Sequence, residues 1–237
     1  IKCQIGIWTY NMESKKEKET TAGEVISRGE QFAERYSKPI MYGVLGVIVV
    51  AFGIWAYIQY VSKPRAAKAS AELFRSEEQF IMGADSAVLK VNGVSEEGVL
   101  RIIDEYSGTA AANLSHLYAG IAYYDLGKYQ EALDELKKFD AKDKMVAPSV
   151  VRLMGDCMVE LDKLDEAVTY FEKAASLADN DVVSPGCLQK AARVYEVQKK
   201  YDNAIAAYEK IVDKYYTASE VDQAEADIVR VKALAGK

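Results

Sequence analysis

The side chains that most often carry out chemistry are scarce in this chain, which has one histidine and three cysteines among 237 residues. His116 could act as a general base only beside a nucleophile or an acid, and the sequence around it shows no such partner. Cys3, Cys157 and Cys187 form no Cys-x-x-Cys pair, so we expect neither a zinc site nor a disulfide framework. Free cysteines commonly behave as small buried hydrophobic residues, and we expect this of Cys157 and Cys187. The alternative is a disulfide between these two, which would contribute about 3–4 kcal/mol in an oxidising compartment.

Two further patterns could bind ligands or accept modifications, and neither is convincing. Asp179-Asn180-Asp181 resembles part of a calcium loop but lacks the required glycine and the terminal glutamate. Asn113-Leu114-Ser115 fits a glycosylation sequon, a three-residue pattern that often occurs by chance. The sequence contains no glycine-rich phosphate loop, nucleophile elbow or paired-histidine metal motif. We therefore predict that the protein is not an enzyme and uses neither a cofactor nor a metal.

The charge distribution argues against nucleic acid as a partner. The formal net charge is −6, and residues 1–38 carry seven basic and six acidic residues. From Pro64 onward there are 22 basic and 30 acidic residues. Affinity for nucleic acid rests on neutralising phosphates, so an acidic domain of this kind is expected to bind other partners.

Small residues recur at a spacing that predicts the fold. Gly98, Ala132, Ala167 and Ala204 lie 34, 35 and 37 residues apart, close to the 34-residue period of tetratricopeptide (TPR) repeats. The TPR pattern requires a large residue, a small pair and an aromatic residue, then an alanine followed four positions later by an aromatic residue. Three consecutive units fill most of these positions. They hold His116, Ala119, Gly120, Tyr123, Ala132 and Leu136 in the first unit, Val151, Met154, Gly155, Met158, Ala167 and Phe171 in the second, and Leu188, Ala191, Ala192, Tyr195, Ala204 and Tyr208 in the third.

These patterns predict an all-α solenoid of helix hairpins. Small residues let the two antiparallel helices of a hairpin approach closely, and large residues fill the space between one hairpin and the next. Pro148 and Pro185 fall at the start of the second and third units, where the first turn of a helix tolerates proline. Turns between the paired helices are expected at residues 127–129, 162–164 and 200–202.

Both ends of the solenoid are expected to be atypical, as in other repeat arrays. Residues 66–82 read as one helix and residues 96–106 as a second, which would form a degenerate first pair with an enlarged loop near 83–94. Residues 219–234 read as a C-terminal capping helix that starts at Ser219.

Residues 39–62 carry no charge and predict a transmembrane helix. As a helix the apolar stretch would be roughly 35 Å long, enough to cross a bilayer core of about 30 Å. It is too long for a cleaved signal peptide, so we expect an uncleaved anchor. Gly46 and Gly53 are seven residues apart and leave homo-oligomerisation through the anchor open, although Gly-x-x-x-Gly is absent. The aromatic residues expected at the membrane interfaces are Tyr42, Trp55, Tyr57 and Tyr60.

The tail before the anchor bears on orientation. Basic residues within about 20 positions of the span number three on the N-terminal side and four on the other, which does not decide the topology. Lysines at 15, 16 and 18 favour a cytoplasmic N-terminus. We expect the natural chain to begin at Met12, and residues 20–38 to form either a docking helix or a solvated linker. The expected domains are a tail at 1–38, a transmembrane helix at 39–62 and a TPR solenoid at 63–237.

Protein partners are expected on the concave face, where the first helix of each TPR unit presents fixed positions. The first unit is apolar there, and the other two carry mixed charge. Leu114, Leu117 and Ile121 either pack against the degenerate first pair or form an apolar groove for a segment of another protein. The lysines and asparagines that clamp a C-terminal carboxylate in some TPR domains are absent. The candidate binding residues are Leu117, Ile121, Tyr124, Arg152, Asp156, Gln189, Arg193 and Glu196.

The whole arrangement resembles the YfgM-type family of bacterial inner-membrane TPR proteins. The stretches that carry this resemblance are the uncharged span at 39–62, IIDEYSGT at 102–109 and YAGIAYYDLGKYQEAL at 118–133. The resemblance implies a cytoplasmic N-terminus and periplasmic repeats. It also implies association with the Sec translocon and periplasmic folding factors.

Two functions follow as hypotheses. The first is an adaptor or chaperone-like factor that binds translocon subunits, folding factors or exported polypeptides while residues 39–62 hold it in lipid. The second is a scaffold subunit of an envelope assembly complex, with one fixed folded partner and no affinity for unfolded chains. In the first hypothesis, tethering raises the effective concentration of weakly bound partners, so modest intrinsic affinity would suffice.

Overall fold

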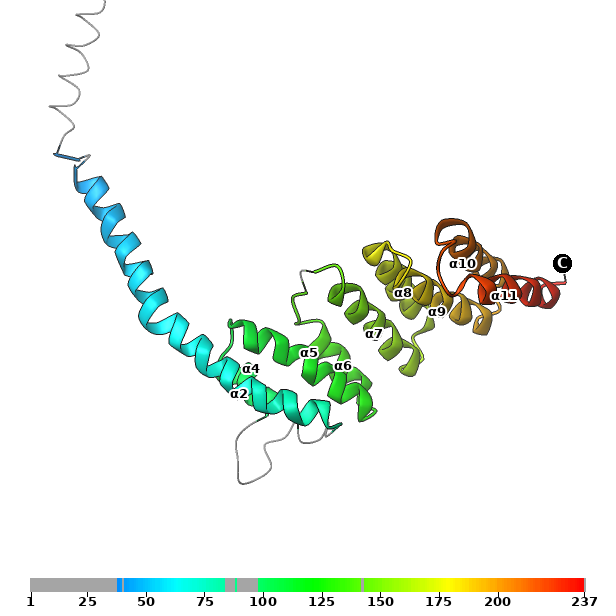
Figure 1. Ribbon diagram of the computed structural model, residues 1–237, viewed down its shortest axis with the longest axis horizontal. Coiled ribbons are helices and arrows are strands. Elements are labelled where there is room, and N and C mark those ends of the chain that lie inside the picture. The colour runs from blue at the N-terminus through cyan, green and yellow to red at the C-terminus, as the bar shows by residue number, and fades with distance from the viewer. Residues whose placement is uncertain (1–37, 40, 84–87, 89–97, 142, 237) are drawn as a thin grey trace, which may run out of the picture. The chain divides into compact units, whose positions relative to one another are not determined.

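The computed structural model describes residues 38–39, 41–83, 88, 98–141 and 143–236. Every regular element within these residues is a helix, which confirms the all-α prediction (Figure 1). The chain divides after Lys63 into two units, which are described separately below. The expected start at Met12 and the docking helix or linker at 20–38 lie outside the described residues, apart from Lys38.

An apolar helix dominates the described part of the first unit. The helical segment Met41–Ile81 contains an 18-residue window with a mean hydropathy of 2.1, and none of that window is buried against protein. The large apolar side chains from Met41 to Val61 are exposed, and a π-helical turn, η1 (Ile58–Ser62), lies within the segment. Among the described residues this is the one helix long and apolar enough to cross a membrane.

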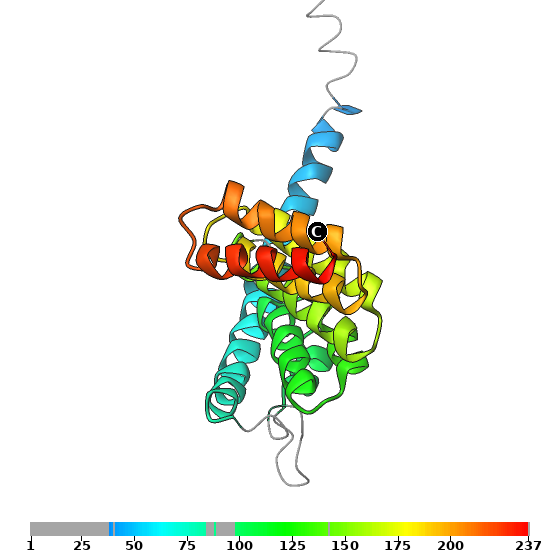
Figure 2. The same ribbon diagram turned by 90° about the vertical axis from the view of Figure 1, so that its right-hand side faces the viewer.

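The second unit is a stack of antiparallel helix hairpins. Helices α5 and α6, α7 and α8, and α9 and α10 form the three predicted hairpins, with α2 and α4 before them and α11 after them. Figure 2 looks along the stack with α11 nearest the viewer. The bounds are α2 (Lys63–Ile81), α4 (Val99–Glu105), α5 (Ala110–Asp125), α6 (Tyr129–Leu136), α7 (Val146–Glu160), α8 (Leu164–Ala178), α9 (Ser184–Val197), α10 (Tyr201–Lys214) and α11 (Val221–Leu234).

The small residues of the repeat pattern lie where the paired helices touch. A Cβ atom placed on Gly120 would lie 2.6 Å from Leu136 Cδ2, and one on Gly155 would lie 2.6 Å from the Phe171 ring. Carbon atoms in contact normally lie about 3.5–4.0 Å apart, so these positions admit no larger residue without movement. The alanines at the start of each second helix, Ala132, Ala167 and Ala204, are completely buried.

The turns inside the three hairpins share one conformation. Gly127, Asp162 and Lys199 occupy the same place in their repeats and have left-handed φ values of 72°, 58° and 58°. The next residue in each turn donates its backbone N–H to a carbonyl five residues back, which closes the end of the first helix. These bonds run from Lys128 to Tyr123 at 2.8 Å, from Lys163 to Met158 at 2.8 Å and from Lys200 to Tyr195 at 2.9 Å.

The hydrophobic core consists of three clusters along the stack. The first joins α2, α4 and α5 through residues such as Leu73, Ile102 and Ala119. The second joins α6 to α9 around Phe171, and the third joins α8 to α11 around Tyr208. Each layer is therefore held mainly by its neighbours, as in other repeat proteins.

Two details at the ends of the solenoid differ from the sequence prediction. Helix α11 begins at Val221 after Glu220, and no side chain caps its N-terminus, so the prediction of a cap at Ser219 was wrong. The Ser219 hydroxyl instead donates to the Glu220 carboxylate at 3.0 Å. In the degenerate pair, Gly98 precedes α4 as its N-terminal flanking residue, whereas Ala132 lies inside α6. The first pair therefore departs from the helical register of the later repeats at this position.

Candidate functional site

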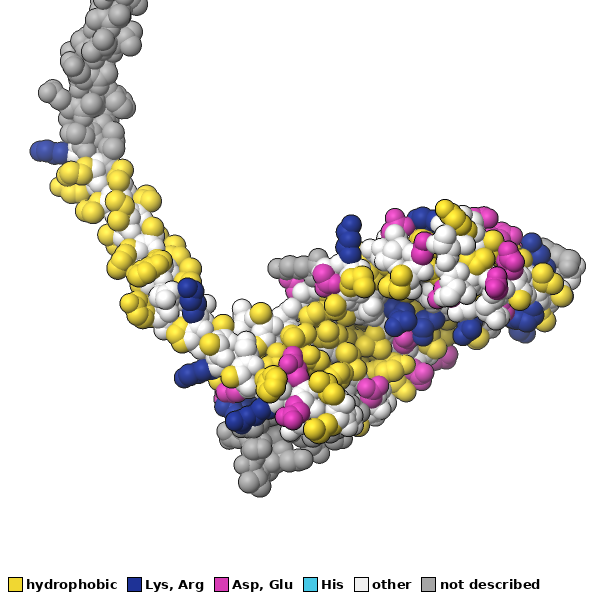
Figure 3. Space-filling model, in the orientation of Figure 1, with side chains coloured by type: hydrophobic (Ala, Val, Ile, Leu, Met, Phe, Trp, Pro, Cys, Tyr) yellow, Lys and Arg dark blue, Asp and Glu magenta, His cyan; other side chains and the backbone are white. Residues whose placement is uncertain are grey.

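The apolar part of the candidate surface lies on α5. Leu117, Ile121 and Tyr124 are half-buried, and the Tyr124 ring centroid lies 5.5 Å from that of Tyr129 in α6. Burial, followed by the nearby carboxylates, raises the pKa of Tyr124, so this phenol remains neutral at physiological pH. Figure 3 shows hydrophobic side chains gathered in a hollow over α5 and α6, with basic side chains beside it towards the C-terminal helices. This part of the surface can bury apolar side chains of a partner.

The two explanations offered for the apolar residues of α5 each apply to part of the set. Leu114 packs against the cluster formed by α2, α4 and α5, as expected for contact with the degenerate first pair. Leu117 packs against the cluster centred on α7 and α8 and keeps part of its side chain accessible. Leu114 is half-buried like Leu117, so both residues contribute accessible apolar area on α5.

On α7 the two candidate residues have different surroundings. Asp156 accepts a hydrogen bond from Lys190 Nζ of α9 at 2.7 Å, and this ion pair links two successive repeats. The Lys190 ammonium also lies 5.8 Å from the centroid of the Phe171 ring. Arg152, one turn before Asp156, is exposed. Asp156 therefore connects repeats, whereas Arg152 is accessible to a partner.

The candidate residues on α9 also include one that contacts another helix and one that is accessible to a partner. Glu196 accepts hydrogen bonds from both terminal nitrogens of Arg230 in α11, at 2.6 and 2.9 Å, and from the Tyr208 hydroxyl at 2.9 Å. The hydrogen bonds from Arg230 hold the pKa of Glu196 below its usual value. Gln189 is half-buried and Arg193 is exposed. Glu196 therefore links α9 to α11 through Arg230, and Arg193 faces solvent.

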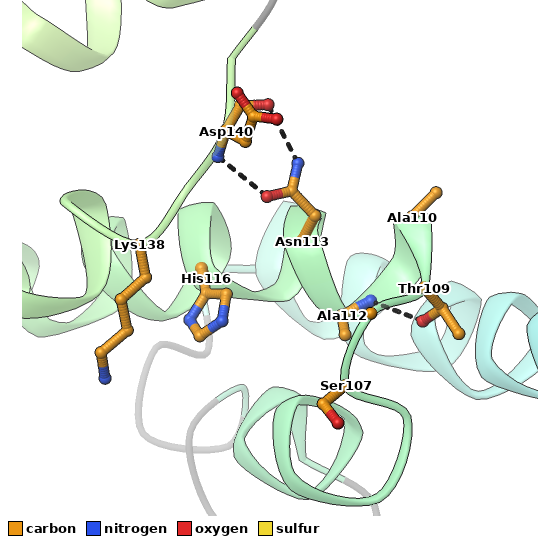
Figure 4. A pocket seen from close by; sticks show the side chains of 9 residues that line it. Ser107, Thr109, Ala110, Ala112, Asn113, His116, Lys138 and Asp140 are labelled. Carbon is orange, nitrogen blue, oxygen red and sulfur yellow. Dashed lines mark hydrogen bonds between the residues drawn. The ribbon is translucent and has the colours of Figure 1, made fainter.

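His116 has an acidic partner that the sequence analysis missed. Its Nδ1 atom lies 2.6 Å from a carboxylate oxygen of Glu135 in α6, and Lys138 Nζ donates to the other oxygen at 2.8 Å. His116 and Lys138 line a cleft of about 510 Å³ beside the turn that precedes α5 (Figure 4). The Thr109 hydroxyl in this cleft already donates to the Tyr106 carbonyl and accepts from the Ala112 amide. The histidine is thus tied to the second helix of its hairpin, and Thr109 is not positioned as a nucleophile.

The carboxylate of Glu135 makes stability depend on pH. Burial raises its pKa, but hydrogen bonds from Lys138 and His116 lower it by more, so the pKa lies below its ordinary value of 4.5. A carboxyl group whose pKa is lower in the folded than in the unfolded protein stabilises the fold at pH values above its unfolded pKa. This contribution disappears as the pH falls through the pKa of the folded state. We expect the free energy of unfolding of Glu135→Gln to fall less than that of the wild type as the pH is lowered below about 5. Urea denaturation at a series of pH values measures this difference, and equal acid sensitivity of the two proteins would contradict it.

The two short motifs noted in the sequence have structural roles. The Asn113 side chain accepts a bond from the Asp140 amide at 2.8 Å and donates to the Asp140 carbonyl at 3.1 Å, which fixes the segment after α6. Asn180 accepts bonds from the Val182 and Val183 amides, while Asp179 pairs with Lys214. Within the described residues no cluster of histidine, cysteine and acidic side chains could hold a metal ion.

Cys157 and Cys187 are free thiols in this structure, and both are completely buried. Burial raises the pKa of Cys157 to about 12 and that of Cys187 to about 11. They therefore pack as small hydrophobic residues, and the alternative of a disulfide between them is wrong for this structure.

Two of the contacts that sequence reasoning missed join neighbouring repeats. Asp156 with Lys190, and Glu196 with Arg230, are each 34 residues apart, which is one repeat. A search for opposite charges at the repeat spacing would have found both pairs. Glu135 lies 19 residues from His116, a spacing set by the hairpin, and only a three-dimensional hairpin model could have placed it.

The comparisons with known proteins concern the repeat architecture. No curated protein sequence matches the chain. Among solved structures, one titled "Crystal structure of MamA" is 23% identical with a TM-score of 0.44, over 58% of this chain and 79% of that chain. Another, titled "Crystal structure of MamA protein", is 19% identical with a TM-score of 0.47, over 69% of this chain and 87% of that chain.

A family model matches much more of the chain. It is described as a tetratricopeptide repeat-like domain and matches residues 30–232. Repeats of this kind present extended concave surfaces to other proteins, so the solenoid is a protein–protein interaction module. The chain belongs to the tetratricopeptide repeat-like domain family.

Proposed function

We propose that the protein is a membrane-anchored adaptor that binds segments of other polypeptides on the concave face formed by α5, α7 and α9. In this proposal it is a YfgM-type protein of the bacterial inner membrane, with residues 1–38 in the cytoplasm, 39–62 in the lipid and 63–237 in the periplasm. Its partners are translocon subunits, periplasmic folding factors and exported polypeptides.

The observation that carries this proposal is the hydrophobic hollow over α5 and α6 (Figure 3). Leu117, Ile121 and Tyr124 are neither fully buried nor fully exposed, so a partner can bury the area that remains accessible. Each Å² of apolar area removed from water contributes about 25 cal/mol to the free energy of binding. Because this contribution depends on area and not on a particular side chain, such a surface suits unfolded segments of different sequence.

The apolar helix supports the same function by concentrating the binding face at a membrane. The family model begins at residue 30, so it spans the apolar segment together with the repeats. A tethered site meets membrane-associated partners at a high effective concentration, so modest intrinsic affinity is sufficient.

Site-specific crosslinking in native membranes tests the proposal. A photo-crosslinking amino acid at position 124 of the full-length chain is expected to capture exported polypeptides together with translocon subunits. The matched control places the same amino acid at Lys173, an exposed position on α8, the second helix of its hairpin. Capture of one stoichiometric folded partner would favour the scaffold hypothesis. Identical adducts from both positions would show that the concave face is not the binding surface.

A further inference from the structure

Two arginines on the concave face stand apart from the other arginines that the structure describes. Arg152 and Arg193 are exposed, and neither makes a hydrogen bond or ion pair with a described residue. The other four described arginines all have partners. Arg65 binds the Glu105 carbonyl, Arg101 pairs with Glu105, Arg230 pairs with Glu196 and Asp227, and Arg75 is also engaged.

An ion pair between two nearby residues relates the positions of the two arginines. The Asp156–Lys190 ion pair joins α7 to α9 at 2.7 Å. Arg152 lies four residues before Asp156, and Arg193 lies three residues after Lys190. Residues three or four apart share one face of a helix, so each arginine lies on the helix face that carries this ion pair.

Three carboxylates on α7, α9 and α11 are already paired. Asp156 is bound by Lys190, and Glu196 and Asp227 are both bound by Arg230. The charges of Arg152 and Arg193 are therefore not matched by these groups. From Pro64 onward the chain carries 30 acidic and 22 basic residues, so two unpaired cations on one face run against its overall charge.

We propose that Arg152 and Arg193 form a cationic site for acidic side chains of a partner polypeptide whose apolar residues lie on the adjoining surface of α5. This inference rests on the proposed function and specifies its partner. The segment recognised has a hydrophobic part next to a part rich in aspartate or glutamate.

Guanidinium chemistry accounts for this specificity. Arginine presents a planar fork of N–H donors that binds a carboxylate through two parallel hydrogen bonds, and its desolvation costs less than that of an ammonium. Two such contacts at an exposed site are expected to change affinity about tenfold, with a strong dependence on salt. A free C-terminal carboxylate is not required, because aspartate and glutamate side chains supply the same group.

The test uses the full-length protein in lipid nanodiscs and three synthetic peptides with amidated C-termini. The peptides share one apolar half, and the other half carries glutamate, serine or lysine. We expect the glutamate peptide to bind about tenfold more tightly than the serine peptide at low salt and the lysine peptide to bind most weakly. Fluorescence anisotropy at low and high salt measures the dissociation constants.

Paired substitutions show which residues carry the preference. In the double variant Arg152→Gln, Arg193→Gln, the glutamate peptide is expected to bind no better than the serine peptide. The matched control, Lys173→Gln with Lys210→Gln, removes the same charge from exposed positions on α8 and α10 and is expected to keep the preference. Equal binding of glutamate and serine peptides to the wild type would overturn this inference but leave the proposed function. Binding of none of the peptides would overturn both.

Discussion

Replacing Gly155 with alanine is expected to lower the free energy of unfolding of the repeat domain by about 2 kcal/mol. The added Cβ would lie 2.6 and 2.7 Å from two carbons of the Phe171 ring. That ring is 1% exposed and packs within the cluster that joins α6 to α9, so it has little room to move. Alanine gains up to about 1 kcal/mol in helix propensity over glycine, which only partly offsets the steric strain. Urea denaturation followed by circular dichroism measures the change.

Gly186 provides the matched control for this substitution. It also lies in a helix, α9, but a Cβ added there would have no atom within 4 Å. Gly186→Ala is therefore expected to leave stability unchanged or raise it by about 0.5 kcal/mol. Equal effects of the two substitutions would show that close approach of α7 and α8 does not depend on Gly155.

Replacing Glu196 with alanine is expected to lower the free energy of unfolding by about 2 kcal/mol. The substitution removes both hydrogen bonds from Arg230 and leaves the hydroxyl of Tyr208, a fully buried residue, without its acceptor. Charge-assisted hydrogen bonds contribute more than neutral ones, and a buried donor left unpaired adds a desolvation penalty. The loss is expected at the C-terminal end of the solenoid, where Arg230 links α11 to α9. Hydrogen exchange of α11 amides, alongside urea denaturation, locates it.

Arg193 lies three residues before Glu196 on the same helix and provides the matched control. Its substitution distinguishes an effect on stability from an effect on partner binding. Because it is exposed and makes no ion pair with a described residue, Arg193→Ala is expected to change stability by less than about 0.5 kcal/mol. Unchanged stability in Glu196→Ala would mean that Glu196 is free to bind partners, as its position in the repeat first indicated.

The repeat architecture could be predicted because it depends on residue size at fixed intervals. Gly120 and Gly155 lie against Leu136 and Phe171, so their spacing reflects a contact within one hairpin that every unit must make. The end elements were less predictable, because no neighbouring repeat constrains them on one side. The helix near Ser219 was predicted correctly, but its capping residue was not, since Glu220 occupies that position without a side-chain cap.

The candidate surface could be predicted only as a set of positions. The repeat register identifies which residues face the concave side, but it does not tell which of them are used by neighbouring helices. Asp156 and Glu196 were assigned to partner binding from their positions, and the structure pairs them with Lys190 and Arg230. Long, flexible side chains choose among several partners, and this choice depends on packing that the sequence pattern does not record.

The burial of Cys157 and Cys187 has a consequence for their reactivity. Burial raises the thiol pKa values to about 12 and 11, so both side chains stay protonated at neutral pH, whereas the thiolate is the reactive form. Alkylating reagents, peroxides and disulfide exchange catalysts therefore act on these two residues only when the repeats open. Since both residues pack as thiols, the fold in this structure does not depend on a disulfide between them.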